Sequence, residues 1–237
     1  MKVKQIDKLI LLFLILALVA LNYSTMDSFI EKTFSTKEEV FVERIIDGDT
    51  IESNIGNIRL LGINTPERGE IYYEEAKNFL ESEIFNKTVM LEFTREKKDK
   101  YNRTLAYIFL DNRNINIEIV KNGFANYYFY DGRDRHSDEL EEAWEECLGK
   151  KINLCEPSGH SCSSCLDITP INIVNTCAFS CDITNWTVKG EGRDKFVFFN
   201  KTIILSDERA EFELDLTNSG GSLFVRDSEG KLVRYFS

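Results

Sequence analysis

The sequence has little positive charge, no cysteine in its first 146 residues and no apolar run of full membrane-spanning length. Among 237 residues, 29 Lys and Arg face 40 Asp and Glu, for a formal net charge of −11. Holding nucleic acid by bulk attraction needs clustered Lys and Arg, so this charge argues against that class. It does not argue against a metal-assisted enzyme, because acidic ligands make a chain acidic. With 43% hydrophobic residues, the chain can bury one or two ordinary cores.

The N-terminal apolar run covers thirteen residues, 9–21, and follows Lys2, Lys4 and Lys8. This pattern is typical of a secretory signal and is short for a membrane span of about 20 residues. No clean small-x-small cleavage site follows, so cleavage and an uncleaved membrane anchor both remain open. We expect 1–23 to be a signal peptide or signal-anchor and 24–39 a polar tether. The protein should therefore be extracellular, secreted or held at the cell surface.

All the cysteines lie in one late window: Cys147, Cys155, Cys162, Cys165, Cys177 and Cys181. An even number of cysteines in an exported chain predicts disulfides. The alternative is a zinc site built from His160, Cys162, Cys165, Cys177 and Cys181. We disfavour it, because free thiolates rarely persist in an oxidising compartment.

The rest of the chain shows two different secondary-structure patterns. Up to residue 149, strand patterns alternate with helical spacing, and we expect helices over 70–85, 116–123 and 137–148. Gly123 would cap the second helix, and Ser137 would cap the third. Gly56-Asn57 predicts a hairpin turn, and the aromatic run 124–130 predicts a strand.

After residue 151 only short strands separated by turns are predicted, which is typical of an all-β sandwich. We place one domain at 40–149, a cysteine-rich linker at 150–166 and a second domain at 167–237.

Charged residues interrupt the strands of the first domain in three of four short motifs. Asp47 and Asp49 occur in "IIDGDT", Arg59 and Glu67 in "IRLLGINTPE", and Arg103 in "DKYNRTLAYI"; the fourth motif is "NGFANYYFY". Burying a charge without a partner is costly, so these residues indicate a site. Carboxylate and carbonyl oxygens hold a hard cation such as Ca²⁺, a glutamate can take a proton from water, and guanidinium groups neutralise a phosphate. This combination suits phosphodiester hydrolysis.

Together, in this order and spacing, the four motifs resemble the staphylococcal nuclease (thermonuclease) family over roughly 40–147. The resemblance implies an OB-fold β-barrel with added helices and a calcium-dependent nuclease that acts on DNA, RNA or both. It assigns Asp49, Asn64 and the Thr65 carbonyl to the metal, Arg59 and Arg103 to the phosphate, and Glu67 to the general base. Candidate substrate-binding residues are Lys100, Tyr101, Tyr128 and Tyr130.

Two positions depart from the family pattern. Asn64 stands where the family has a second metal-binding aspartate, so calcium should bind more weakly. Asn102 stands where the family has glycine, so it must adopt the turn conformation that glycine would supply. Neither departure removes a phosphate ligand or the base.

The C-terminal part, about 168–237, is similar to the lamin-tail family, an immunoglobulin-like β-sandwich. The resemblance rests on "DITNWTVKG", "FVFFNKTIIL" and "SLFVRDSEGKLVRYF", and Trp186 is expected in its core. It implies an adhesion or positioning role with a possible cell-surface partner. The overall expectation is a mainly β protein. The alternative to an enzyme is a surface module that binds nucleic acid with little or no catalysis; such a module would not need a base at Glu67.

Overall fold

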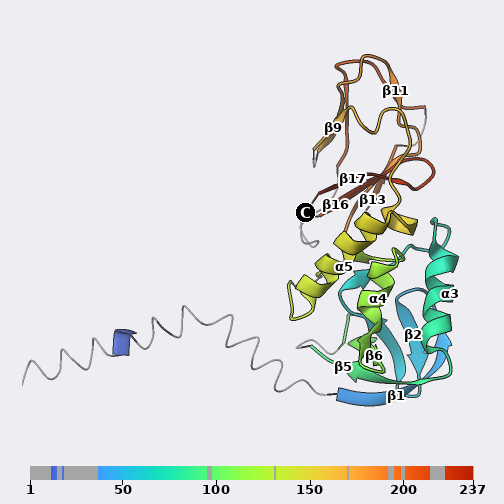
Figure 1. Ribbon diagram of the computed structural model, residues 1–237, viewed down its shortest axis with the longest axis vertical. Helices are drawn as coiled ribbons and strands as arrows, with labels where there is room; N and C mark the ends of the chain where they lie inside the picture. The colour runs from blue at the N-terminus through green and yellow to red at the C-terminus, as the bar shows by residue number, and fades with distance from the viewer. Residues whose placement is uncertain are drawn as a thin grey trace, which may run out of the picture. The chain divides into compact units, whose positions relative to one another are not determined.

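The computed structural model describes residues 12–14, 18, 37–94, 98–130, 132–169, 171–191, 195–198, 201–213 and 222–236. Lys37–Ser237 forms one compact unit (Figure 1). The predicted signal segment 1–23 and tether 24–39 lie mostly outside the described residues. Within the described ranges, no helix is long and apolar enough to cross a membrane.

The first half of the unit is a closed β-barrel. Its strands are β1 (Lys37–Ile45), β2 (Thr50–Ser53), β3 (Gly56–Leu60), β5 (Thr88–Glu92) and β6 (Thr104–Leu110), with a short β7 (Arg113–Asn114) after them. They pair in the order β3-β2-β1-β5-β6-β7, and a parallel pairing of Ile58 with Thr104 joins β3 to β6. Closure leaves the barrel without a free edge. The predicted mainly β fold with an OB-like barrel is confirmed.

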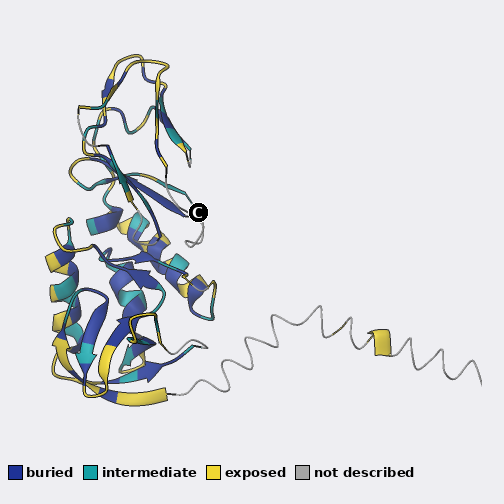
Figure 2. Ribbon diagram, turned by 180° about the vertical axis from the view of Figure 1, so that it is seen from behind, coloured by how far each residue is buried: buried dark blue, intermediate teal, exposed yellow. Residues whose placement is uncertain are grey.

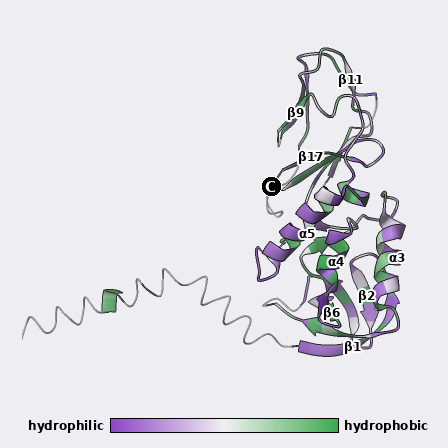
Figure 3. Ribbon diagram, in the orientation of Figure 1, coloured by the Kyte–Doolittle hydropathy of each residue, from purple (hydrophilic) through white to green (hydrophobic). Residues whose placement is uncertain are grey.

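Three α-helices occur among the described residues of this unit: α3 (Tyr73–Ile84), α4 (Ile115–Lys121) and α5 (Ser137–Lys150), followed by a 3-10 turn at Asn153–Cys155. Helix α3 buries Ala76, Leu80 and Ile84 at the four-residue spacing that predicted it. Helix α4 carries mostly hydrophobic side chains (Figure 3). Gly123 follows α4 with φ +70°, which confirms the predicted cap.

Three local predictions were wrong. The β2–β3 turn is Asn54-Ile55, because Ser53 pairs with Gly56 and leaves only those two residues in the loop. Ser137 is the first helical residue of α5, and its hydroxyl bonds Asp134 rather than capping.

The third concerns the aromatic run 124–130, in which only β8 (Asn126–Tyr127) is a strand; it pairs with β4 (Ile63–Asn64). The chain leaves this pairing because the Phe129 amide bonds the side chain of Glu191 instead.

Among the described residues, the C-terminal strands form three small sheets. One joins β9 (Leu166–Ile168), β10 (Asn172–Asn175) and β15 (Arg209–Glu211), and another joins β11 (Cys181–Asp182) and β14 (Ile203–Ile204). The largest contains β12 (Thr187–Gly190), β13 (Lys195–Val197), β16 (Leu223–Arg226) and β17 (Leu232–Phe236). As predicted, none of the described residues after Cys155 is helical.

Strand β16 belongs to two cores at once. Leu223 and Val225 pack with Trp186 in the core of the C-terminal strands, which confirms the predicted place of that tryptophan. Phe224 faces the other way, into the barrel's core, where its ring lies 5.3 Å from that of Trp144. Side chains alternate along a strand, so a strand that separates two cores is buried on both faces (Figure 2). The predicted boundaries 40–149, 150–166 and 167–237 stay predictions.

The structure pairs all six cysteines in disulfides, as the favoured prediction expected. Cys162–Cys181 and Cys165–Cys177 lie together in the C-terminal part. Cys147–Cys155 instead joins the end of α5 to the 3-10 turn, and both residues belong to the barrel's core. The cysteine window therefore serves two structural regions, not one.

Candidate active site

An ion pair between Asp49 and Arg59 lies at the centre of the site. Asp49 is in the β1–β2 loop and Arg59 in β3, and antiparallel pairing of Thr50 with Arg59 brings the two together. The Arg59 Nη2 atom lies 3.0 Å from Asp49 Oδ2, and both side chains are buried. The amide of Thr65 donates to the same carboxylate oxygen at 3.1 Å, and the Thr50 hydroxyl donates to the other oxygen at 3.1 Å. These donors keep the carboxylate in one orientation.

The Arg59 guanidinium also bonds the chain that leads to the Asn64–Glu67 corner. It donates to the carbonyl oxygen of Leu60, and to that of Ile63 at 2.7 Å. Arg59 thus connects the strand that carries it with the turn that follows.

Asp47 lies beside Asp49 and adds a second negative charge. Its Oδ1 atom accepts the Asp49 amide at 3.1 Å. Burial, and then the neighbouring charge of Asp49, raise the pKa of Asp47 above its ordinary value. Two neighbouring carboxylates are a favourable environment for a cation.

Asn64 is buried, and its side chain reaches the C-terminal strands. The Nδ2 atom donates to the carbonyl oxygen of Glu191 at 3.1 Å. An aspartate here would place an oxygen against that carbonyl oxygen. The structure therefore gives a physical reason for asparagine at the position where the resemblance leads one to expect a carboxylate.

Arg103, the second predicted phosphate ligand, is held by its own hairpin. Its Nε atom donates to Asp99 Oδ2 at 2.7 Å, and its Nη1 atom donates to the Thr50 hydroxyl at 3.4 Å. Burial would raise the pKa of Asp99, but hydrogen bonds from Arg103 outweigh it and hold that pKa below its usual value. Because Thr50 also bonds Asp49, one chain of contacts connects Asp49, Thr50 and Arg103.

Asn102 has φ +63°, so it adopts the left-handed turn conformation expected where the family has glycine. Its amide donates to the Asp99 carbonyl at 2.9 Å, which closes the turn that presents Arg103.

Glu67 is exposed, at the end of the corner. Its amide donates to Glu70 Oε2 at 2.8 Å, and the Glu70 amide donates back to the Glu67 carbonyl at 2.8 Å. These two bonds define the backbone position of Glu67.

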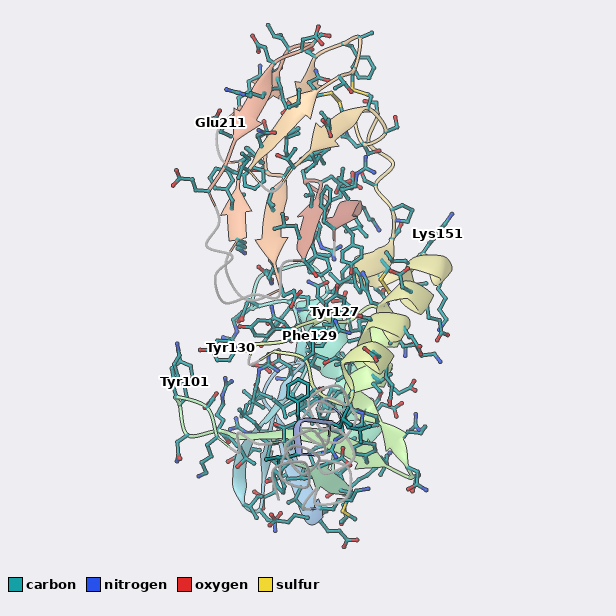
Figure 4. The ribbon with its side chains drawn as sticks, turned by 90° about the vertical axis from the view of Figure 1, so that its left-hand side faces the viewer. Tyr101, Tyr127, Phe129, Tyr130, Lys151 and Glu211 are labelled. Atoms are coloured by element: carbon teal, nitrogen blue, oxygen red, sulfur yellow. A yellow bond between two sulfur atoms is a disulfide. The ribbon has the colours of Figure 1, made fainter. Side chains whose placement is uncertain are left out.

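The four predicted substrate-binding residues lie on two segments. Tyr101, 63% exposed, is flanked by Lys100 and Arg103, whose charged groups lie 5.2 and 5.5 Å from the centre of its ring. On the aromatic run, Tyr128 and Tyr130 have ring centres 6.0 Å apart, and Tyr130 is 60% exposed. Tyr101 and Tyr130 project outward, whereas Tyr127 and Phe129 lie inside (Figure 4).

The structure thus brings Asp49, Arg59, Thr65 and Arg103 together through hydrogen bonds and an ion pair, with Asn64 and Glu67 on the same corner. Asp99, which orients Arg103, is the first residue of the quoted motif "DKYNRTLAYI". Thr50 was part of a quoted motif without a role of its own. Glu70 and Glu191 were missed, since no local pattern connects them to the motifs.

Known proteins match the chain over this region. The family model described as staphylococcal nuclease homologue matches residues 57–156, which include Arg59, Glu67 and Arg103. The thermonuclease of Staphylococcus intermedius is 37% identical over 129 residues, covering 50% of this chain and 77% of that protein. The thermonuclease of Staphylococcus hyicus is 33% identical, over 48% of this chain and 73% of that protein.

An uncharacterized endonuclease of Haemophilus influenzae is 35% identical, over 48% of this chain and 64% of that protein. The likeness and the geometry coincide, because the matched region carries both arginines and the glutamate of the corner. The chain therefore belongs to the family of staphylococcal nuclease homologues and is a nuclease that hydrolyses phosphodiester bonds.

Proposed function

We propose that the protein is an exported, calcium-dependent endonuclease that cleaves DNA, RNA or both. The observation that carries the proposal is the contact network that holds Asp49, Thr50, Arg59 and Arg103 around the Asn64–Glu67 corner. The apolar run 9–21 supports export.

The oxygen-rich corner suits a hard divalent cation. The Asp49 carboxylate, the Asn64 side-chain oxygen and the Thr65 carbonyl oxygen would hold it, and all three residues are buried. Oxygen donors with a single formal charge fit calcium at the concentrations found outside cells. When bound, the cation would make water a better nucleophile.

The remaining chemistry belongs to the chain's own side chains. Glu67 accepts or orients the proton of the attacking water. Arg59 and Arg103 donate to the phosphate and stabilise the negative charge that grows on it in the transition state. Tyr101 and Tyr130 offer exposed faces on which bases can stack.

For the C-terminal strands we propose a lamin-tail-like module that attaches or positions the enzyme at a cell surface. The sequence similarity around Trp186 supports this role. If the N-terminal segment is not cleaved, it would hold the enzyme at the membrane.

Digestion assays test the proposal. Purified protein is incubated with single-stranded DNA, double-stranded DNA and RNA, with calcium and with chelator. We expect cleavage that the chelator abolishes; absence of such cleavage for every substrate would contradict the proposal.

Glu67→Gln should still bind nucleic acid while cleaving about 10²–10⁴-fold more slowly. If Glu67→Gln and the natural protein cleaved at the same rate, the activity would come from a contaminating nuclease. That result would favour the non-catalytic binding module.

Asn64→Asp should bind calcium about tenfold more tightly, or roughly 1.4 kcal/mol, because it restores a carboxylate to the site. The same change should cost about 1–3 kcal/mol of stability without calcium, since it replaces the donor to the Glu191 carbonyl with an oxygen. Calcium titration of activity and thermal unfolding in chelator measure the two effects.

The matched control is Asn54→Asp, which adds the same charge at the other end of β2 and keeps the oxygen that accepts from Phe41. Overlapping calcium curves for Asn64→Asp and the natural protein would show that Asn64 is not a ligand.

A further inference from the structure

The segment just after the Asn64–Glu67 corner contacts the sheet formed by β12, β13, β16 and β17, called the C-terminal sheet below. Glu70 forms ion pairs with two lysines of that sheet: Lys189 of β12, at 3.3 Å, and Lys195 of β13. Glu70 is also the residue whose carboxylate accepts the Glu67 amide. A short path of contacts therefore leads from the C-terminal sheet to the backbone of the proposed base.

The next two residues are held by the β16–β17 turn. Gly230 lies so close to Ile71 that a Cβ atom on it would come within 2.6 Å of the Ile71 side chain. Lys231 donates to the Tyr72 hydroxyl at 3.4 Å. Three consecutive residues, 70–72, thus each contact the C-terminal strands.

Backbone geometry indicates that these contacts constrain the segment. Tyr72, which precedes the first residue of α3, has φ +68°, a left-handed conformation that is unfavourable for a bulky residue. Such a conformation persists only where the surroundings determine it. Here the contacts of residues 70–72 with the C-terminal strands accompany it.

Lys189 is more deeply buried than an ordinary surface lysine. Its side chain is only 13% exposed, and burial lowers its pKa while the facing Glu70 acts in the opposite direction. Burial would raise the pKa of Glu70, but Lys189 and Lys195 outweigh it and hold that pKa below its usual value. Buried ion pairs contribute little net stability, so a role in fixing geometry is the better explanation for such a pair.

We propose that Lys189 and Lys195 are positioning residues for the nuclease reaction: through Glu70 they hold Glu67 in place, so the C-terminal sheet is part of the active site. The inference rests on the proposed role of Glu67 as the base. It extends the catalytic apparatus beyond the region that the family resemblance covers.

The test uses the full chain with Lys189→Met, Lys195→Met and the double variant. We expect kcat to fall by about tenfold in the double variant, because small displacements of a catalytic group are costly. The KM for nucleic acid and the calcium requirement should stay unchanged, since neither lysine is proposed to bind them. Lys189→Arg, which keeps the charge and reach, should restore most of kcat.

The matched control is Lys121→Met, which removes a lysine from an ion pair with Glu146 at 3.0 Å between α4 and α5. It should leave kcat unchanged. Glu70→Gln should also lower kcat. Combining it with Lys189→Met should cause almost no additional loss, because both changes interrupt the same Lys189–Glu70–Glu67 path. Should Lys189→Met fold poorly, Lys195→Met alone still carries the test, because Lys195 is more exposed.

Hydrogen exchange of residues 65–72 gives a readout that does not need activity. We expect faster exchange in the double variant than in the natural protein or in Lys121→Met. Unchanged kcat and unchanged exchange would overturn the inference, as would a raised KM with kcat preserved, which would make the lysines substrate ligands. If the natural protein cleaves nothing while exchange responds as expected, the proposed function fails and the positioning contacts stand.

Discussion

Replacing Arg103 with alanine is expected to lower turnover by about 10²–10³-fold while changing the melting temperature by only a few degrees. The large loss follows from removing a guanidinium that stabilises charge in the transition state. The small change in stability follows from the partly exposed pair that Arg103 forms with Asp99, since such pairs contribute about 1 kcal/mol or less.

Kinetics on a defined oligonucleotide and thermal unfolding measure the two effects. Arg133→Ala is the control, because Arg133 is also an ion-paired arginine of this domain, bonded to Asp138 and Glu141. It should keep normal turnover. Near-normal turnover in Arg103→Ala would mean that this arginine does not contact the phosphate.

Replacing Arg59 with alanine is expected to damage both turnover and folding. Turnover should again fall by about 10²–10³-fold. In addition, the change leaves the buried Asp49 carboxylate without the guanidinium that pairs with it. It also removes the hydrogen-bond donor to the carbonyl oxygens of Leu60 and Ile63. Breaking a buried pair from one side costs about 3–5 kcal/mol, which corresponds to a fall in melting temperature of roughly 6–20 °C.

The motifs alone predict equal effects for the two arginines, with the fold intact in both variants. The burial of Arg59 changes that expectation. Arg59→Lys keeps the charge but lacks the planar fork, so it should recover part of the stability and little of the turnover. Saturating calcium should stabilise Arg59→Ala by binding near Asp49. An unchanged melting temperature without calcium would show that the Asp49–Arg59 pair does not form.

The sequence by itself determined the residue types of the site, their order and most of the elements that carry them. Helix α3 followed from apolar residues four apart, and the cap of α4 from Gly123. These signals are local, because a helix or strand places neighbours a few residues apart on one face. The left-handed turn at Asn102 followed from the family resemblance, because the family has glycine at this position.

Only the tertiary structure decided which of these residues are buried, what they contact and where the aromatic run stops being a strand. Asn64 bonds a carbonyl 127 positions away, the Phe129 amide bonds a carboxylate 62 positions away, and Lys189 reaches Glu70 across 119 positions. Contacts over such separations leave no period in the sequence, since they depend on how two sheets pack. The motifs therefore predict a nuclease site, while the packing of the C-terminal sheet shows which further residues support it.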